Sequence, residues 1–378
     1  MKKRIVALFL LTAVLAVSVL CAQAVSERKN GALVIESKVM EVEKYGHALL
    51  ETTIEDFLAS GYELGDTVDV MFDNGYILTD IPFFNGYYVD RGQPLLRAYP
   101  GHTNIAVCIN YGKLNEVAGV DVGSAVVICM NTKAGALDTQ VLNSLVYTTD
   151  RADYASDAVF ANFRMITAGN IVPGRLFRGA SPVDNSYNRS PYVDAFLREA
   201  GVNGIIDLAD TPQELSAYFE NGSLDASYVK ILYDNNGILA LGMSVDYASQ
   251  DFANRLAAGL SRVKGLKTPL FIHCTEGKDR AGFVSALLEG LMGATYDEIV
   301  ADYMKSFENY YSITREGSPD KYGVIVKNNI DDMLRVISGA GRDADLKAVD
   351  YGAAARDFLA LHGMELSSID FLISCLGK

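Results

Sequence analysis

One segment of the chain, PLFIHCTEGKDRAGFVSALLEGLMG, constrains the fold more than any other. It begins with an apolar run, residues 269–272, that is typical of a buried strand. Residues 275–280 form a polar turn, and a helix rich in small residues is expected to begin near Ala281. A buried strand that leads through a tight turn into a helix is typical of α/β domains with a mainly parallel sheet.

The rest of the chain divides into two parts. Between residues 25 and 150 apolar and polar positions alternate and turns recur, as at Asp73-Asn74-Gly75, which predicts a small mostly-β accessory domain, a barrel or a sandwich. From 151 to 378, strand patterns such as GIIDLAD and YVKILYD alternate with helix patterns and end in a run of helices. This order predicts an α/β domain with a central, mainly parallel sheet flanked by helices and a helical C-terminal part.

The first 24 residues predict an export signal. Lys2, Lys3 and Arg4 precede an apolar run, and Ala22-Gln23-Ala24 fits the small-x-small cleavage pattern. We therefore expect cleavage after Ala24 and an exported protein that is extracellular, cell-surface or periplasmic. A retained membrane anchor is the alternative, because the apolar run approaches the length of about 20 residues that spans a bilayer.

Charge and cysteine content narrow the classes further. The net charge of −14 argues against general binding to nucleic acid, which depends on clustered Lys and Arg. Cys108 and Cys129 lie in two apolar stretches, and the sequence leaves open whether they form a disulfide or remain buried thiols. Cys375 is expected in the core of a C-terminal helix.

Cys274, at the end of the predicted strand, stands apart through its surroundings. The N–H groups of the turn and the positive end of the helix form a cradle for an anion, and Arg280 can bind two oxygens of a phosphate. An ionised thiol beneath such a cradle is suited to attack phosphorus. Further members of the cradle are expected at the substrate: His273, Thr275, Glu276, Gly277 and Lys278.

The motif HCTEGKDRAG resembles the H-C-x5-R signature loop of the cysteine-dependent protein tyrosine phosphatase superfamily. It is most similar to the bacterial atypical tyrosine/serine branch, whose dual-specificity members also act on phosphoinositides. The segments ANFRMI, GRLFRGASP and GVNGIIDLAD extend the resemblance over residues 158–378. The resemblance implies that Cys274 forms a phosphocysteine, that Arg280 and the loop amides hold the phosphate oxygens, and that His273 fixes the cysteine backbone. It implies no cofactor and no metal.

Two positions depart from the family pattern. Many members carry Ser or Thr directly after the arginine, where it assists release of the thiolate, whereas this chain has Ala281. The family strand that often reads Asp-Leu-Arg is Asp207-Leu208-Ala209 here. The first departure puts the speed of phosphocysteine hydrolysis in question and leaves the first step untouched.

The general acid that protonates the leaving group has three candidates. Asp279 lies within the loop, where a carboxylate would repel phosphate unless it served a function, and we favour it. Asp246 precedes Cys274 by a number of residues close to that which separates acid and cysteine in better-known phosphatases, so it is the next candidate. We expect its side chain to lie beside the substrate. Asp234 is the third, although a turn role explains it equally well.

Other charged residues near the motif have less defined roles. Lys278 is expected to attract a second phosphate, as on inositol lipids, and Glu276 to point to solvent. Arg164 and Arg178 either line the site or hold the front of the domain in place.

The sequence therefore predicts an exported phosphatase that acts on phosphotyrosine or phosphoserine proteins or on phosphoinositides, with transient membrane contact through such a substrate. One alternative is an inositol polyphosphate (phytate) phosphatase, since some secreted relatives carry an additional β-rich domain. Another is a catalytically weak module that binds phosphorylated ligands, for which Ala281 is the only support.

Overall fold

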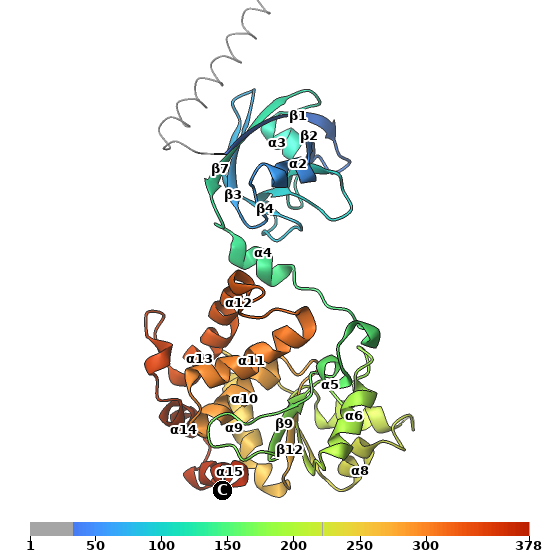
Figure 1. The fold of residues 1–378 in the computed structure, drawn as a ribbon, viewed down its shortest axis with the longest axis vertical. Helices are drawn as coiled ribbons and strands as arrows, with labels where there is room; N and C mark the ends of the chain where they lie inside the picture. The colour runs from blue at the N-terminus through green and yellow to red at the C-terminus, as the bar shows by residue number, and fades with distance from the viewer. Residues whose placement is uncertain (1–32, 221, 378) are drawn as a thin grey trace, which may run out of the picture. The chain divides into compact units, whose positions relative to one another are not determined.

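The computed structural model describes residues 33–220 and 222–377, which fall into two compact units that divide between Leu145 and Val146 (Figure 1). The division lies close to the boundary expected at residue 150. The predicted export signal, residues 1–24, lies outside the described residues. Within the described part of the chain, no helix combines the length and the apolar character needed to cross a membrane.

The first unit is a closed barrel whose strands follow the order β1-β2-β6-β5-β4-β3-β7. Neighbouring strands pair antiparallel except β4 and β5, which are parallel. Val68, Val70 and Phe72 are buried in β3, and the turn after them closes at Gly75, whose φ of +89° suits glycine. The strands are β1 Val34–Val42, β2 Ala48–Thr53, β3 Thr67–Phe72, β4 Ile77–Phe84, β5 Pro94–Arg97, β6 Asn104–Ile109 and β7 Ala125–Thr132.

Short helices complete the barrel unit: α2 Ile54–Ala59, α3 Leu114–Ala118 and α4 Leu137–Asn143. Cys108 and Cys129 are both buried, and no disulfide joins them. Burial raises the pKa of the Cys108 thiol to about 12, which leaves it protonated and unreactive at neutral pH.

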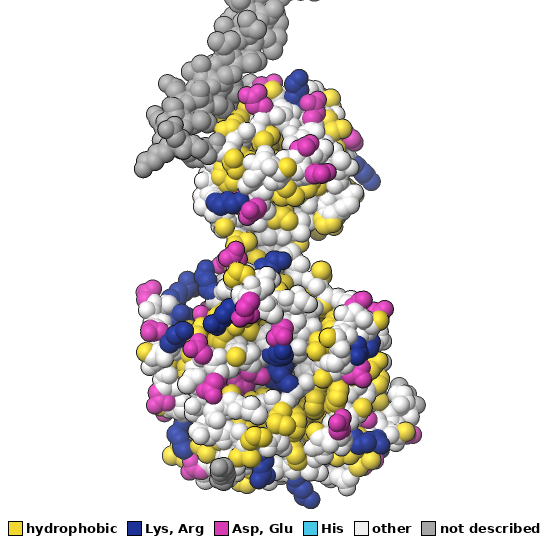
Figure 2. Space-filling view, in the orientation of Figure 1, with side chains coloured by type: hydrophobic (Ala, Val, Ile, Leu, Met, Phe, Trp, Pro, Cys, Tyr) yellow, Lys and Arg dark blue, Asp and Glu magenta, His cyan; other side chains and the backbone are white. Residues whose placement is uncertain are grey.

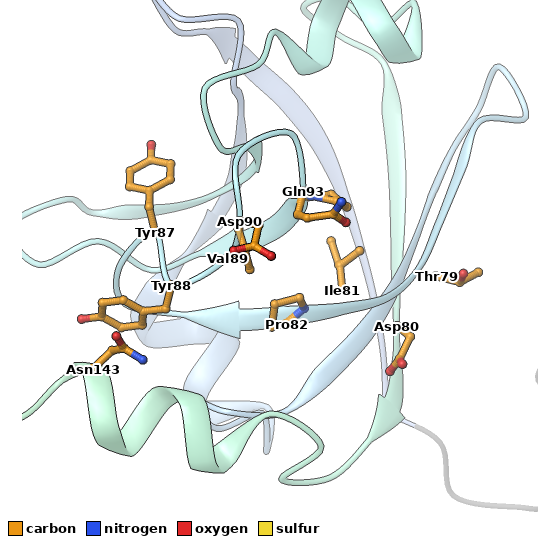
Figure 3. Close-up of a pocket in the computed structure, with 11 residues that line it drawn as sticks. Thr79, Asp80, Ile81, Pro82, Tyr87, Tyr88, Val89, Asp90, Gln93 and Asn143 are labelled. Carbon is orange, nitrogen blue, oxygen red and sulfur yellow. The ribbon is translucent and has the colours of Figure 1, made fainter. Parts of the chain in front are cut away.

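A pocket of about 610 Å³ opens beside β4 in this unit (Figure 3). Thr79, Asp80 and Ile81 reach it from β4, Tyr88 from the following loop, and Asn143 from α4. Its remaining lining residues are Pro82, Tyr87, Val89, Asp90, Gln93 and Pro94. Because it contains two aspartates and no basic side chain, this pocket is unsuited to an anionic substrate.

The second unit has a five-stranded sheet in the order β11-β10-β12-β9-β8. Strands β9 to β12 are parallel to one another, and β8 pairs antiparallel with β9 at the edge. Every residue of β9, β10 and β12 is buried, as expected for parallel strands that are covered on both faces. The strands are β8 Arg164–Met165, β9 Leu176–Gly179, β10 Gly204–Asp207, β11 Ile238–Ala240 and β12 Leu270–His273.

Helices cover both faces of this sheet: Figure 1 shows α6 and α8 on one side of β9 and β12 and α9, α10 and α14 on the other. The described helices are α5 Asp157–Phe160, α6 Ser190–Glu199, α7 Pro212–Glu220, α8 Tyr228–Asp234, α9 Gln250–Ser261, α10 Asp279–Leu291, α11 Tyr296–Tyr311, α12 Pro319–Ile325, α13 Asp331–Ser338, α14 Tyr351–Leu361 and α15 Leu366–Leu376. The α/β architecture with a helical C-terminal part is thus present.

One element differs from expectation. Residues 228–234, YVKILYD, were predicted as a strand and form helix α8, and the strand that follows is β11. The Ser227 side chain accepts a hydrogen bond from the Lys230 N–H and caps the helix. Val229 and Leu232 are buried at a spacing of three residues, which is the spacing of one face of a helix. The composition of the segment predicted a strand, but its buried positions follow the helical period.

Candidate active site

The cysteine loop, residues 274–280, connects β12 to α10 at the carboxyl edge of the parallel sheet. Cys274 directly follows β12 and is only 4% exposed. Helix α10 begins at Asp279, two residues before the expected start, so Arg280 lies in its first turn. The N–H groups of a first helical turn carry partial positive charge and favour an anion. The loop therefore brings a thiol, a guanidinium and a helix N-terminus to one place.

Gly277 allows the loop to pass against the neighbouring strand. Its φ is +70°, and a Cβ built on it would lie 2.1 Å from the carbonyl oxygen of Gly179 at the end of β9. The Thr275 carbonyl accepts a hydrogen bond of 3.1 Å from the N–H of Ser181, just after that strand. The shape of the loop is consequently set by the backbone of β9 and of the residues that follow it.

Arg280 turns its guanidinium back toward the start of the loop. Nη2 donates to the hydroxyl of Thr275 at 3.3 Å, and Nη1 donates to the carbonyl of Met243 at 3.1 Å. Because Thr275 is the neighbour of Cys274, the structure brings the predicted nucleophile and the predicted phosphate-binding arginine together.

Two buried arginines support the loop from behind. Arg178 donates to the carbonyl oxygens of Gly277 at 2.9 Å and Lys278 at 3.2 Å, and its other Nη pairs with Asp302 at 2.5 Å. Arg164 pairs with the same carboxylate at 2.7 Å. Burial alone would raise the pKa of Asp302, but the two guanidinium groups outweigh it and hold that pKa well below its usual range. Arg178 thus holds the carbonyl side of the cysteine loop and Arg164 holds Asp302, which is a third arrangement beside the two considered from the sequence, lining the site or holding the front of the domain.

The sequence did not single out several members of this support. The Asn162 amide donates to the carbonyl oxygens of Glu276 and Gly277 at 3.2 and 3.3 Å, and the Tyr310 hydroxyl donates to that of Glu276 at 2.6 Å. Asp302 and Tyr310 both lie on α11. Asp302, Ser306 and Asn309 follow one another at spacings of four and three residues, and these polar residues on one face of an amphipathic helix were the available signal.

His273 lies behind the loop beside two acidic side chains. In the parallel register of β10 and β12, Asp207 stands opposite His273, and Oδ1 lies 3.8 Å from the imidazole Nε2. Burial lowers the pKa of His273 to about 4, so the imidazole is neutral at pH 7. Burial also raises the pKa of Asp207 to about 6. The pKa of Asp210 is raised to about 7, mainly by burial and in addition by the nearby negative charge of Asp207. The sequence had not assigned Asp210 any role.

The three candidate acids are placed differently. Both carboxylate oxygens of Asp279 accept from Lys278 Nζ, at 2.9 and 2.8 Å, at the mouth of the loop. Asp246 is exposed and lies in the segment that provides the Met243 carbonyl to Arg280. Asp234 pairs with Lys230 at 2.6 Å just before β11, at the opposite end of the sheet from the loop. The structure therefore separates Asp234 from the site and leaves Asp279 and Asp246 near it.

Lys278 and Glu276 also differ from expectation. The Glu276 carboxylate is only 20% exposed and accepts a hydrogen bond from the Tyr147 hydroxyl, so the prediction that it points to solvent is wrong. Lys278 is 13% exposed, pairs with Asp279 and lies 3.7 Å from Glu276. Burial would lower its pKa, but Asp279 and nearby tyrosines outweigh burial and raise it. The lysine charge is thus already matched by carboxylates of the loop.

A metal site has no support in the part of the chain that the structure describes, since His, Cys, Asp and Glu form no cluster there that could hold an ion. The thiol of Cys274 is buried, and the hydroxyl of its neighbour Thr275 accepts a hydrogen bond from Arg280.

Comparison with known proteins places these observations in a family context. Residues 160–344 match the tyrosine phosphatase family. The chain is 34% identical over 101 residues to a Cupriavidus necator protein named as a tyrosine-protein phosphatase, covering 26% of this chain and 37% of that protein. It is 26% identical over 188 residues to the triple specificity protein phosphatase PtpB of Mycobacterium tuberculosis, covering 38% of this chain and 66% of that protein. The chain spans less than two thirds of the length of either relative.

Solved structures give weaker likenesses. An uncharacterized conserved protein from Thermotoga maritima is 19% identical with a TM-score of 0.22, covering 25% of this chain and 36% of that one. The core catalytic domain of the PP-IP phosphatase SIW14 from S. cerevisiae, in complex with citrate, is 16% identical with a TM-score of 0.26, covering 47% of this chain and 91% of that one. Neither likeness is strong enough to support an inference.

Proposed function

The chain belongs to the cysteine-based protein tyrosine phosphatase superfamily, and from that premise we propose that it is a phosphoric monoester hydrolase that works through a phosphocysteine on Cys274. The observation that carries the proposal is the cysteine loop itself. Cys274 ends a buried strand, Arg280 lies in the first turn of the following helix, and Gly277 fits only as glycine between them.

In the first step, the Cys274 thiolate attacks phosphorus, so that an S–P bond forms as the P–O bond to the leaving group breaks. Arg280 and the loop amides stabilise the charge on the equatorial oxygens. The leaving oxygen takes a proton from Asp279, which we propose as the general acid, with Asp246 as the alternative. In the second step, water attacks phosphorus, the S–P bond breaks, and phosphate and the thiolate are released.

We propose phosphorylated proteins, phosphotyrosine first and phosphoserine second, as the substrates, with phosphoinositide monoesters as a further class. Aromatic side chains close to the loop support an aryl phosphate: Tyr147 and Tyr310 contact Glu276, and Phe307 lies beneath Lys278 at 5.4 Å. The names of the two relatives also point to protein phosphatases. A phytate phosphatase has less support, because Lys278 is already matched by carboxylates.

The test is a substrate panel of p-nitrophenyl phosphate, phosphotyrosine and phosphoserine peptides, phosphoinositide vesicles and phytate. We expect Cys274→Ser to abolish turnover on every substrate while inorganic phosphate still binds. Full activity of Cys274→Ser would overturn the mechanism. Asp279→Asn should lower kcat most for substrates with a poor leaving group. If Asp246→Asn shows that loss and Asp279→Asn keeps wild-type kcat, the general acid is Asp246. Phosphate binding by wild-type protein without turnover would favour a binding module.

We further propose that the protein is exported and that its N-terminal 24 residues are removed. The charged start, the apolar run and Ala22-Gln23-Ala24 support this proposal. N-terminal sequencing of protein recovered from the medium or the cell envelope tests it, because a mature chain that begins at Val25 is the expected result. Recovery only from the membrane with Met1 retained would favour an anchor.

A further inference from the structure

Glu276, at the middle of the cysteine loop, is held at both its side chain and its main chain. Its carboxylate accepts a hydrogen bond from the Tyr147 hydroxyl. Its carbonyl oxygen accepts from the Tyr310 hydroxyl at 2.6 Å and from the Asn162 amide at 3.2 Å. Asp279 is the other acidic residue of the loop. Among the hydrogen bonds of the described residues, its carboxylate accepts only from the neighbouring Lys278, so it is not held by a distant segment as Glu276 is.

Tyr147 is itself fixed by an aromatic cluster. Its ring stacks on Tyr310 with centroids 5.1 Å apart and meets Tyr311 edge-on at 5.7 Å. The guanidinium of Arg189 lies 4.8 Å from the Tyr147 ring and 4.6 Å from the Tyr310 ring. Arg189 is almost completely buried and is held by a hydrogen bond of 2.8 Å to the Phe160 carbonyl. The direction of the Tyr147 hydroxyl is therefore set by packing rather than by solvent.

The protonation of Tyr147 suits the role of donor. Burial and then the Glu276 carboxylate raise the pKa of Tyr147 above its usual value, so the phenol keeps its proton at neutral pH. Tyr147 lies in the segment 146–150, which precedes the first helical turn of the unit and belongs to no strand or helix. A residue outside the core elements thus reaches the centre of the cysteine loop.

A phosphate-binding loop needs its amide groups fixed and its acidic side chains kept away from the anion. The Glu276 carboxylate already lies 3.7 Å from Lys278, and without the Tyr147 hydroxyl its negative charge would no longer be held in one position beside the phosphate site. We propose that Tyr147 is a positioning residue of the phosphatase site, which fixes the cysteine loop by holding the Glu276 carboxylate away from the incoming phosphate. This inference rests on the proposed function, because it assumes that the loop binds phosphate.

The experiment compares Tyr147→Phe, Glu276→Ala, Glu276→Gln and the double variant Tyr147→Phe/Glu276→Ala in the full chain. With p-nitrophenyl phosphate, Tyr147→Phe should lower kcat/KM about tenfold, as expected when a hydrogen bond to an ionised group is lost. It should weaken competition by inorganic phosphate by a similar factor and leave the thermal midpoint within a few degrees, because the ring still packs on Tyr310. Glu276→Gln keeps an acceptor for the hydroxyl and should lower kcat/KM less than Glu276→Ala does.

The matched control is Tyr192→Phe, since Tyr192 packs edge-on against Phe160 at 5.4 Å in the same aromatic cluster and, among the hydrogen bonds of the described residues, donates none to Glu276. It should keep wild-type kinetics. In the double variant, the loss should be no larger than in the single variants, because both changes remove the same interaction.

Two results would overturn the inference: wild-type kinetics and phosphate affinity in Tyr147→Phe, or losses in the double variant that equal the product of the single losses. Both are distinct from failure of the proposed function, which would appear as full activity in Cys274→Ser. If the wild-type protein turns over no substrate, inorganic phosphate binding alone still separates the variants.

Discussion

Replacing Gly277 with alanine tests whether the cysteine loop depends on contact with β9. The new Cβ would lie 2.1 Å from the Gly179 carbonyl oxygen, 2.2 Å from its carbon and 2.8 Å from the Ala180 nitrogen. All three atoms belong to backbone, and real Cβ atoms essentially never approach within 3.0 Å of a neighbour, so the loop must move by about 0.9 Å. The φ of +70° adds strain for any residue with a side chain.

The magnitude follows from two terms. An alanine in the left-handed region costs about 1–2 kcal/mol, which the folded protein can absorb. Displacement of the loop affects function more, because the loss of one donor to the developing charge lowers kcat about 10²- to 10³-fold. The hydrogen bond of 2.9 Å from Arg178 to the Gly277 carbonyl would be disturbed as well. We therefore expect kcat/KM to fall at least about a hundredfold in a protein that still folds.

The assay is turnover of p-nitrophenyl phosphate, with competition by inorganic phosphate and a thermal melt on the same samples. Gly265→Ala is the matched control, because its Cβ would meet no heavy atom within 4 Å and its φ is not in the left-handed region. The control should retain wild-type activity. Activity of Gly277→Ala within about threefold of wild type, with an unchanged melt, would refute the argument that the contact with β9 sets the shape of the loop.

Three further outcomes follow from the site. The pKa of Asp210 is raised to about 7 in the folded protein, so the folded state binds this proton more tightly than the unfolded state, and the stability that it contributes is lost as the pH rises through 7. Asp210→Asn removes this titration and should narrow the difference in melting temperature between pH 5 and pH 8. An unchanged difference would contradict the expectation. Arg178→Met should cost about 3–5 kcal/mol in urea unfolding because it leaves Asp302 buried without this partner, whereas Arg356→Met at an exposed pair should cost less than about 1 kcal/mol. Because Ala281 lacks a hydroxyl, stopped-flow traces should show a burst of nitrophenol, and Ala281→Ser should raise the steady rate relative to the burst; absence of a burst would place the slow step before phosphocysteine hydrolysis.

The sequence predicted the cysteine loop because its information is local. A buried strand, a glycine-containing turn and a helix start within a dozen residues determine where Cys274 and Arg280 lie. An error of two residues remained at one helix end, because α10 begins at Asp279 and not near Ala281. Shifts of one or two residues are common at helix ends.

What the sequence could not predict depends on contacts between distant segments. Tyr147 and Glu276 are separated by 129 positions, and Arg178 and Asp302 by 124. No periodicity joins such pairs, because only the folded sheet brings the segments together. The reading of residues 228–234 as a strand failed for a related reason: apolar β-formers predict either element when the segment is short, and the Ser227 cap decides between them.

Charge balance at the loop bears on the substrate class. Lys278 and Arg280 offset the charges of Glu276 and Asp279, and the Cys274 thiolate of the proposed mechanism adds one negative charge to the loop. In Figure 2, acidic and basic side chains are interspersed over the visible face of the second unit and do not gather into a basic patch. A phosphate must then be held by Arg280, the loop amides and the start of α10, which together form one anion site. A ring with several phosphates would need further cations outside that site, whereas a single phosphomonoester needs only the groups that the loop already provides. The Tyr147 contact matters for the same reason, because a Glu276 carboxylate free to move could bring its negative charge closer to the bound phosphate.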